Sequence, residues 1–195
     1  RKWLLKWKNG LVVRRAFRYG GNEMRTMEHF RNRRSVRNFT KGDVPDEVIA
    51  EALEAGNLAP SAGNLQARDF VVVRDQEKKR VLADAAHSQQ FLADASVVIV
   101  CCANQERIAG YGPRGRELYC IQDVAAAVEN MLLYLADAGY GACWVGAFNE
   151  RKVSDLLRLP MHVRPLALLP VGRPAAEGRS PSRMGIDSLV HFEEW

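Results

Sequence analysis

One apolar stretch, residues 118–141, constrains the fold of this 195-residue chain more than any other. Its sequence, "LYCIQDVAAAVENMLLYLADAGYG", is rich in Ala and Leu and predicts a helix that ends at Gly139 or Gly141. Apolar residues fall on nearly every side of this helix, and a helix that is apolar all round is buried all round. Because a chain of this length has room for one core, we expect a second copy of the molecule to cover part of the helix in an extensive dimer interface.

Other segments predict helices and strands that intermix along the chain. The stretch "GDVPDEVIAEALEAGNLAP" predicts a helix that is capped by Asp43 and stops at Gly56. Residues 76–86 and 149–160 predict two more helices, and residues 104–118 predict a glycine-rich surface loop. Strands are predicted for the apolar runs 69–75, 96–103, 142–148 and 164–174. The sequence therefore predicts one α+β domain, followed by a long C-terminal arm.

The charge of the chain is uneven. The formal net charge is +5, yet residues 1–25 hold eight Lys and Arg and one acid, Glu23, and the remainder holds 20 basic and 22 acidic residues. Such a leader is compatible with nucleic-acid binding, with an acidic membrane surface or with a targeting peptide. Its apolar run at 11–13 is too short for a secretory signal, and no stretch reaches the roughly 18 apolar residues of a membrane span. We interpret residues 1–26 as a basic N-terminal extension and residues 27–195 as the folded domain.

The cysteines and histidines form no catalytic or metal-binding pattern. The four cysteines lack CxxC spacing, and the four histidines lack HExxH and HxH spacings. No GxSxG motif is present, no GxGxxG directly follows a predicted strand, and no P-loop motif occurs. The sequence thus predicts a cytoplasmic protein with reduced thiols, without a metal site and without hydrolase, Rossmann or P-loop chemistry.

Three short stretches are instead suited to a bound cofactor. The arginines and serine of "RRSVRNF" (33–39) are groups that hold phosphate. The small residues of "APSAGNLQ" (59–66) let a flat ligand approach the backbone, and Asn64 and Gln66 can bind the polar edge of a heterocycle. "CWVGAF" (143–148) ends with backbone N–H groups that could face a ligand, and the tail adds Arg173, Arg179 and Arg183. Each stretch alone is more often a charged surface or a turn, but together they indicate a cofactor that carries the chemistry.

The order of these motifs resembles that of the FMN-dependent nitroreductase family. Over about residues 27–195, "RRSVRNF", a helix, "APSAGNLQ" and a strand precede "QDVAAAVENMLLYLADAGYGACWVGAF" and "LLPVGRP". The resemblance implies an α+β fold with a mixed sheet flanked by helices, in an intertwined homodimer whose C-terminal arm embraces the partner. It also implies FMN at the subunit interface and NADH or NADPH as the reductant.

The resemblance assigns FMN contacts to individual positions of this chain. Arg33, Arg34 and Ser35 are expected near the phosphate and ribityl chain. Arg37 is expected at the N1/C2-carbonyl edge, where a cation stabilises the reduced flavin, and the backbone of Gly146 or Ala147 is expected at N5. The remaining implied positions are Trp144 and Val145 over one flavin face, Gln122 near the ring, Arg183 at the phosphate and, from the other subunit, Pro60, Ser61, Ala62, Asn64 and Gln66.

The function implied is hydride transfer from NAD(P)H through FMN to a nitroaromatic, a quinone or a similar flat acceptor, with no catalytic side chain certain. An alternative is a specialised flavin enzyme on the same scaffold, a dehalogenase or a dehydrogenase. A less favoured alternative is nucleic-acid or membrane-surface binding through the leader. The chain has Ala67-Arg68 where many members carry Pro-Trp, and its insert 104–116 is shorter than in the larger members, so we expect both regions to shape substrate access.

Overall fold

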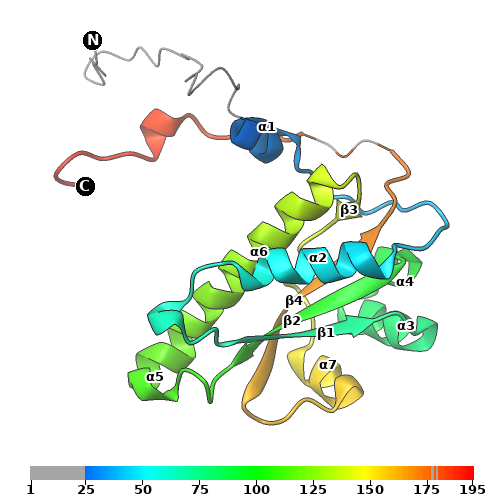
Figure 1. Ribbon diagram of the computed structural model, residues 1–195, viewed down its shortest axis with the longest axis horizontal. Helices are drawn as coiled ribbons and strands as arrows, with labels where there is room; N and C mark the ends of the chain where they lie inside the picture. The colour runs from blue at the N-terminus through cyan, green and yellow to red at the C-terminus, as the bar shows by residue number, and fades with distance from the viewer. Residues whose placement is uncertain (1–24, 177, 179) are drawn as a thin grey trace.

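The computed structural model describes residues 25–176, 178 and 180–195, which form an α+β domain with an extended C-terminal arm (Figure 1). Nearly all of the basic leader therefore lies outside the described residues. The α-helices are α1 (Arg25–Asn32), α2 (Asp46–Asn57), α3 (Gln76–Ala85), α4 (Phe91–Asp94), α5 (Gly112–Arg114), α6 (Cys120–Asp137) and α7 (Glu150–Leu157). The strands are β1 (Arg68–Val73), β2 (Val97–Asn104), β3 (Gly141–Ala142) and β4 (Val163–Gly172).

The strands form one sheet in the order β1-β2-β4-β3, and each neighbouring pair is antiparallel. A parallel bridge between Ser35 and Ala142 adds the segment after α1 to this sheet. Every residue of β2 is buried, because α2 and α6 cover one face of the sheet and α3, α4 and α7 cover the other. This explains why β2 reads as a continuous apolar run and lacks the polar alternation of a half-exposed strand.

Helix α6 confirms the helix expected from the longest apolar stretch. Gly139, with a φ of 80°, follows the end of the helix and takes the left-handed conformation that glycine adopts at no steric cost. Val128, Met131 and Leu135 are fully or almost fully buried against α2 and the sheet. The opposite side of the helix is only half-buried within one chain; it includes Ala126 and Leu133.

Helix α2 differs at both ends from the prediction. Asp43 does not cap it: the N-cap residue is Pro45, without a side-chain cap bond. Instead, the backbone N–H of Val44 donates to Ser96 Oγ at 2.9 Å, which fixes the entry into the helix. Gly56 lies inside the helix, where an added Cβ would be 3.1 Å from Cγ of Met131 on α6. This glycine therefore permits close helix packing, and the prediction of a stop at this position is wrong.

The strand predicted at 142–148 is interrupted. Gly141 and Ala142 pair with β4, and Val145 exchanges two backbone hydrogen bonds of 3.0 and 2.9 Å with Leu168 in the same register. That register places Cys143 opposite Pro170, which has no N–H to donate. The missing donor explains why the ladder breaks after two residues.

The loop predicted at 104–118 is largely helical. Short turns cover Ala109–Tyr111, Gly112–Arg114 and Gly115–Tyr119 and lead directly into α6. The Asn104 side chain starts the segment by accepting from the backbone N–H of Arg107 at 3.2 Å, and the fully buried Ile108 anchors it to the core. The glycines in this segment suggested a loop, but the buried anchor and the helix that follows outweigh their preference.

Candidate functional site

The arginine-rich segment after α1 is held against the end of the sheet. The backbone N–H of Val36 donates to the Ala142 carbonyl at 2.9 Å, and the Val36 side chain is buried. An added Cβ at Gly141 would lie 2.7 Å from Cγ1 of Val36, so only glycine permits this approach. Burial of Val36 leaves Ser35 and Arg37 on either side of it exposed and available to a ligand.

A cavity of about 630 Å³ opens between this segment and the C-terminal arm. That volume is typical of small-molecule sites, which span roughly 300–1,000 Å³. The lining contains five arginines and no acidic residue: it consists of Phe30, Arg31, Arg33, Arg34, Ser35, Arg37, Ser180, Pro181 and Arg183. The structure thus brings together Arg33, Arg34, Ser35, Arg37 and Arg183, as the resemblance implies, and their combined charge favours an anionic ligand.

The arginines of the cavity have different partners. Nε of Arg33 lies 3.6 Å from a carboxylate oxygen of Glu129 on α6. The guanidinium of Arg34 donates to the backbone carbonyls of Arg31 and Arg33 at the end of α1. The guanidinium of Arg37 lies 6.0 Å from the centre of the Phe91 ring, with no carboxylate paired to it among the described residues. Arg37 therefore offers the least compensated charge of the three.

The segment 143–148 lies beside these arginines. Burial raises the pKa of the Cys143 thiol, while the charge of Arg37 and a hydrogen bond with Ser35 act in the opposite direction, so these three side chains are close neighbours. Trp144 is 40% exposed, and Val145 is buried in the core. Gly146 and Ala147 are exposed, so their backbone is accessible to a ligand.

The loop between α2 and β1 carries the other implied positions. It is compact: the backbone N–H of Gln66 donates to Ser61 Oγ at 3.0 Å, and the Gln66 side chain donates to the Asn64 carbonyl at 3.1 Å. Asp123 on α6 accepts from the backbone N–H groups of Ala62 at 2.9 Å and Ala67 at 3.4 Å. Pro60, Ser61, Ala62, Asn64 and Gln66 thus lie on one ordered loop, and Gln122 is exposed next to Asp123.

Within one chain, the implied positions form two groups. Figure 1 shows the loop between α2 and β1 near the α5 end of α6, whereas the segment after α1 and the strand β3 lie near its opposite end. The lining of the 630 Å³ cavity accordingly includes none of the loop residues.

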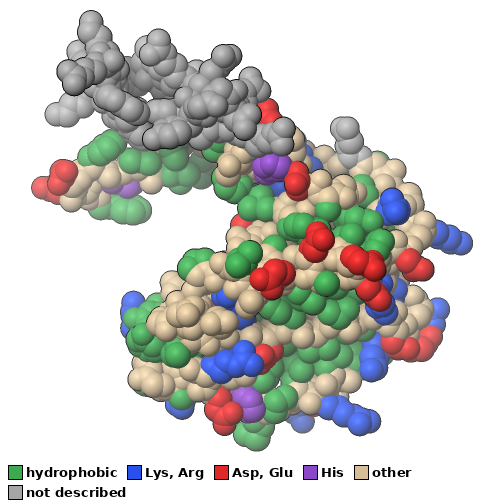
Figure 2. All heavy atoms as spheres, in the orientation of Figure 1, with side chains coloured by type: hydrophobic (Ala, Val, Ile, Leu, Met, Phe, Trp, Pro, Cys, Tyr) green, Lys and Arg blue, Asp and Glu red, His purple; other side chains and the backbone are tan. Residues whose placement is uncertain are grey.

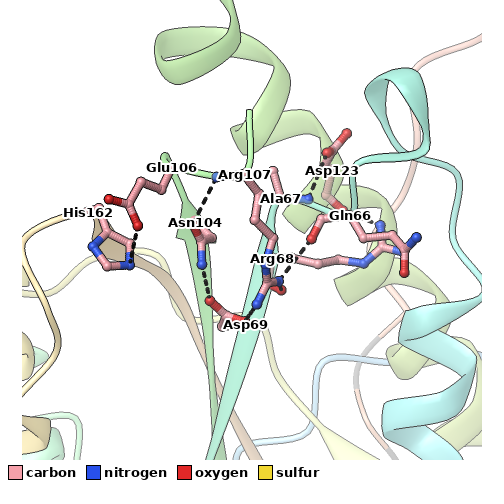
Figure 3. A network of polar contacts seen from close by, with 9 residues as sticks. All are labelled: Gln66, Ala67, Arg68, Asp69, Asn104, Glu106, Arg107, Asp123 and His162. Carbon is pink, nitrogen blue, oxygen red and sulfur yellow. Dashed lines mark hydrogen bonds and ion pairs between the residues drawn. The ribbon is translucent and has the colours of Figure 1, made fainter. Parts of the chain in front are cut away.

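Two buried charged residues of this region were not predicted as site residues. Arg68 and Asp123 are each 4% exposed, and both bind the loop between α2 and β1 (Figure 3). Each of them could have been identified from its place in an apolar segment, Arg68 at the start of a strand and Asp123 within a helix. A charged residue in such a segment is expected to be buried, and buried charges almost always have partners.

The described residues contain neither a group of three or more potential metal ligands nor a helix long and apolar enough to cross a membrane. The donors of the cavity are guanidinium and hydroxyl groups, which suit a phosphate rather than a metal ion. Fold and cavity together define an α+β protein with a basic cavity suited to an anionic ligand.

Comparison with known proteins specifies the family. The model of the nitroreductase family matches residues 30–91 and 83–173, so the chain belongs to the nitroreductase family. "NADH dehydrogenase" of Thermus thermophilus is 31% identical over 186 residues, covering 81% of this chain and 91% of that protein. "FMN reductase (NADPH)" of Bacillus subtilis is 31% identical over 180 residues, covering 85% and 72%. The structure of NADPH:FMN oxidoreductase from Vibrio harveyi complexed with NAD+ matches with a TM-score of 0.80 at 28% identity, covering 87% of this chain and 77% of that one.

Proposed function

We propose that this protein is an FMN-dependent oxidoreductase that transfers electrons from NADH or NADPH to a nitroaromatic, a quinone or a similar flat acceptor. The observation that carries the proposal is the arginine-lined cavity, in which Arg33, Arg34, Ser35, Arg37 and Arg183 meet. Relatives named FMN reductase and NADPH-flavin oxidoreductase support it. Bound FMN would supply the hydride chemistry, and the chain would supply binding, orientation and charge.

The residues present fit FMN at both of its ends. Arg33, Arg34 and Ser35, joined by Arg183 from the arm, would bind the phosphate through charge-assisted hydrogen bonds. Arg37 would stabilise negative charge at the N1/C2-carbonyl edge, because no carboxylate neutralises it among the described residues. Trp144 would cover one face of the ring, with the backbone of Gly146 or Ala147 directed at N5.

We further propose that the protein acts as a homodimer. Within one chain the loop with Pro60, Ser61, Ala62, Asn64 and Gln66 lies away from the arginine-lined cavity, so a second copy would bring its loop to the flavin. Two features support this arrangement: the outer side of α6 is half-buried, and the arm carries exposed apolar side chains. A cytoplasmic location remains an expectation from the sequence.

A spectrum of the purified protein tests the function. After reconstitution with FMN and removal of free flavin, we expect bound flavin absorbance bands that bleach when NADPH or NADH is added without oxygen. A nitroaromatic or a quinone added afterwards should restore the bands. Protein that retains no flavin would overturn the proposal. A single acceptor that is reduced far faster than all the others would instead indicate a specialised flavin enzyme.

A further inference from the structure

The loop between α2 and β1, taken together with the last residue of α2 as residues 57–67, has a backbone that is costly to form. Gly63, Asn64 and Gln66 have φ values of 56°, 56° and 51°, in the left-handed region. Glycine adopts this region freely, but Gln in particular does so at a cost of order 1 kcal/mol or more. Such a conformation persists only where its surroundings determine it, so something in the fold must hold this loop.

Arg68 makes the bonds that close the loop. From the start of β1, its guanidinium donates to the carbonyls of Asn57 and Ala59, both at 2.8 Å, and to that of Pro60 at 3.3 Å. One cation therefore satisfies three carbonyls where α2 ends and the loop begins. Its Nη1 also lies 3.4 Å from the backbone carbonyl oxygen of Asp123, and Figure 3 shows the side chain extending from β1 toward α6.

Asp123 holds the other part of the loop and compensates the charge of Arg68. Its two carboxylate oxygens accept from the backbone N–H groups of Ala62 and Ala67, which lie on either side of the left-handed residues. Burial lowers the pKa of Arg68, and the negative charge of Asp123 counteracts this effect. Arg68 and Asp123 therefore support the same loop from two sides, each through the backbone groups that it binds.

The rim of the loop has a weaker, exposed clamp. Arg107 donates to the carbonyls of Gln66 at 3.1 Å and Arg68 at 2.7 Å and pairs with Asp69 at 2.6 Å (Figure 3). Its side chain is 46% exposed, so solvent screens these interactions more than those of the buried pair. The buried pair is therefore the principal support.

We propose that Arg68 and Asp123 are positioning residues, which hold loop 57–67 in the conformation that presents Ser61, Asn64 and Gln66 to the cofactor. The loop's contact with FMN rests on the proposed function, whereas the ordering of the loop does not. In this chain, an arginine at the start of β1 supports the loop by binding three of its carbonyls. The support of the loop is thus electrostatic and specific to its hydrogen-bond geometry.

Amide hydrogen exchange on the full chain tests the ordering without any cofactor. In Arg68→Met we expect peptides covering 57–67 to exchange about tenfold faster or more, the change expected for one lost charge-assisted hydrogen bond. The exchange rate of the loop in Arg68→Lys should lie between the rates in Arg68→Met and the wild type. A lysine ammonium group retains the positive charge but lacks the planar set of N–H donors of the guanidinium. The exchange of β2 should stay unchanged in both variants.

Arg74→Met is the matched control, since Arg74 donates to the Val44 carbonyl at 3.0 Å at the other end of α2. It should leave the exchange of 57–67 unchanged. If Arg68→Met fails to fold, Asp123→Asn replaces it, and the same local increase is expected. Unchanged exchange of the loop, or an equal rise in the loop and β2, would overturn the proposal.

FMN binding tests the positioning role. We expect the Kd for FMN to rise about tenfold in Arg68→Met, with partial recovery in Arg68→Lys and a changed visible circular dichroism of the bound flavin. Faster exchange of the loop with unchanged Kd and dichroism would contradict the positioning role. A wild-type protein that binds no FMN would overturn the proposed function, while hydrogen exchange would still decide whether the pair orders the loop.

Discussion

At the scale of single residues, arginines of one short segment differ in how their charge is compensated. Arg33 is half-buried and lies 3.6 Å from Glu129. Arg37 is exposed and contacts the Phe91 ring at 6.0 Å. Arg33 thus shares its charge with a carboxylate, whereas the charge of Arg37 is free to stabilise negative charge that develops during a reaction.

This difference predicts separable effects of two substitutions. Arg33→Ala should weaken FMN binding by about tenfold, the loss of one charge-assisted interaction, with little change in the turnover of flavin-saturated protein. Arg37→Ala should do the reverse, lowering turnover more than affinity. Flavin fluorescence titration and steady-state kinetics at saturating FMN measure both effects, and equal FMN affinity in wild type and Arg33→Ala would remove the phosphate role.

The sequence predicted the polar residues that line the cavity better than the buried residues that support the loop between α2 and β1. Arg33, Ser35 and Arg183 belong to polar motifs whose chemistry is visible in the sequence, and the cavity brings them together. Arg68 and Asp123 bind carbonyls and N–H groups of the backbone, which no side-chain motif reveals. Predicting them requires knowing which loop folds over them.

At the scale of elements, contacts between neighbouring segments determine where helices and strands end, which the sequence did not predict. The sequence predicts α2, α3, α6 and α7 as helices and the continuous apolar run of β2 as a strand, and these elements are confirmed. The interruption of the strand after Ala142 depends on Pro170, which lies 28 positions further along the chain. Gly56 is a similar case, because a glycine near the end of a helix can either terminate the helix or allow another element to pack closely. The short distance to Met131 of α6 shows that Gly56 allows close packing.

The contact between β3 and the arginine segment gives a prediction about Gly141. Gly141→Ala should destabilise the protein by about 1–3 kcal/mol, because the added Cβ would lie 2.7 Å from Val36 Cγ1 and 2.8 Å from Val36 Cβ. Gly110→Ala is the control, since no atom lies within 4 Å of its added Cβ. Thermal unfolding monitors both variants, and an unchanged Tm for Gly141→Ala would show that the segment shifts without cost.

The pairing of α7 with β4 gives a prediction about pH. Glu150 accepts two hydrogen bonds from Arg164, at 2.7 and 2.8 Å, and these lower the pKa of Glu150. Because the pKa is lower in the folded state, the stabilisation is present above the unfolded pKa and is lost as the pH falls through the folded one. Arg164→Gln should therefore cost about 0.5–1 kcal/mol at pH 7, as expected for a partly exposed pair, and progressively less below about pH 4.

Urea unfolding across this pH range measures the effect. Arg151→Gln is the control. The ion pair of Arg151 with Asp155 is longer, at 3.9 Å, and well exposed, so the stability of this variant should equal that of the wild type. A cost for Arg164→Gln that persists undiminished at low pH would assign it to packing of the arginine stem instead.

At the scale of the whole molecule, the arm is the least self-contained part. Figure 2 shows hydrophobic side chains along it and an open space between the arm and the body of the molecule. Met184, Leu189, Phe192 and Trp195 are each more than half exposed, an arrangement typical of an interaction surface. The composition of this segment predicts an arm, and we propose that a second copy of the chain covers it.

Removal of residues 184–195 tests this proposal while keeping Arg183. We expect the truncated chain to dissociate into monomers at concentrations where the full chain is dimeric, because it loses the apolar surface of the arm. Light scattering during size-exclusion chromatography gives the mass. A full-length protein that is monomeric at every concentration would contradict the dimer, and an unchanged dimer after truncation would assign the interface to α6 alone.

The separation of the two groups of implied residues along α6 has a thermodynamic consequence. If each flavin contacts the arginine cavity of one subunit and the loop of the other, association and cofactor binding are linked equilibria, and each strengthens the other by the same factor. Dilution would then release flavin as well as subunits, and excess FMN would hold the dimer together. The measured affinity for FMN would depend on the concentration of the protein itself.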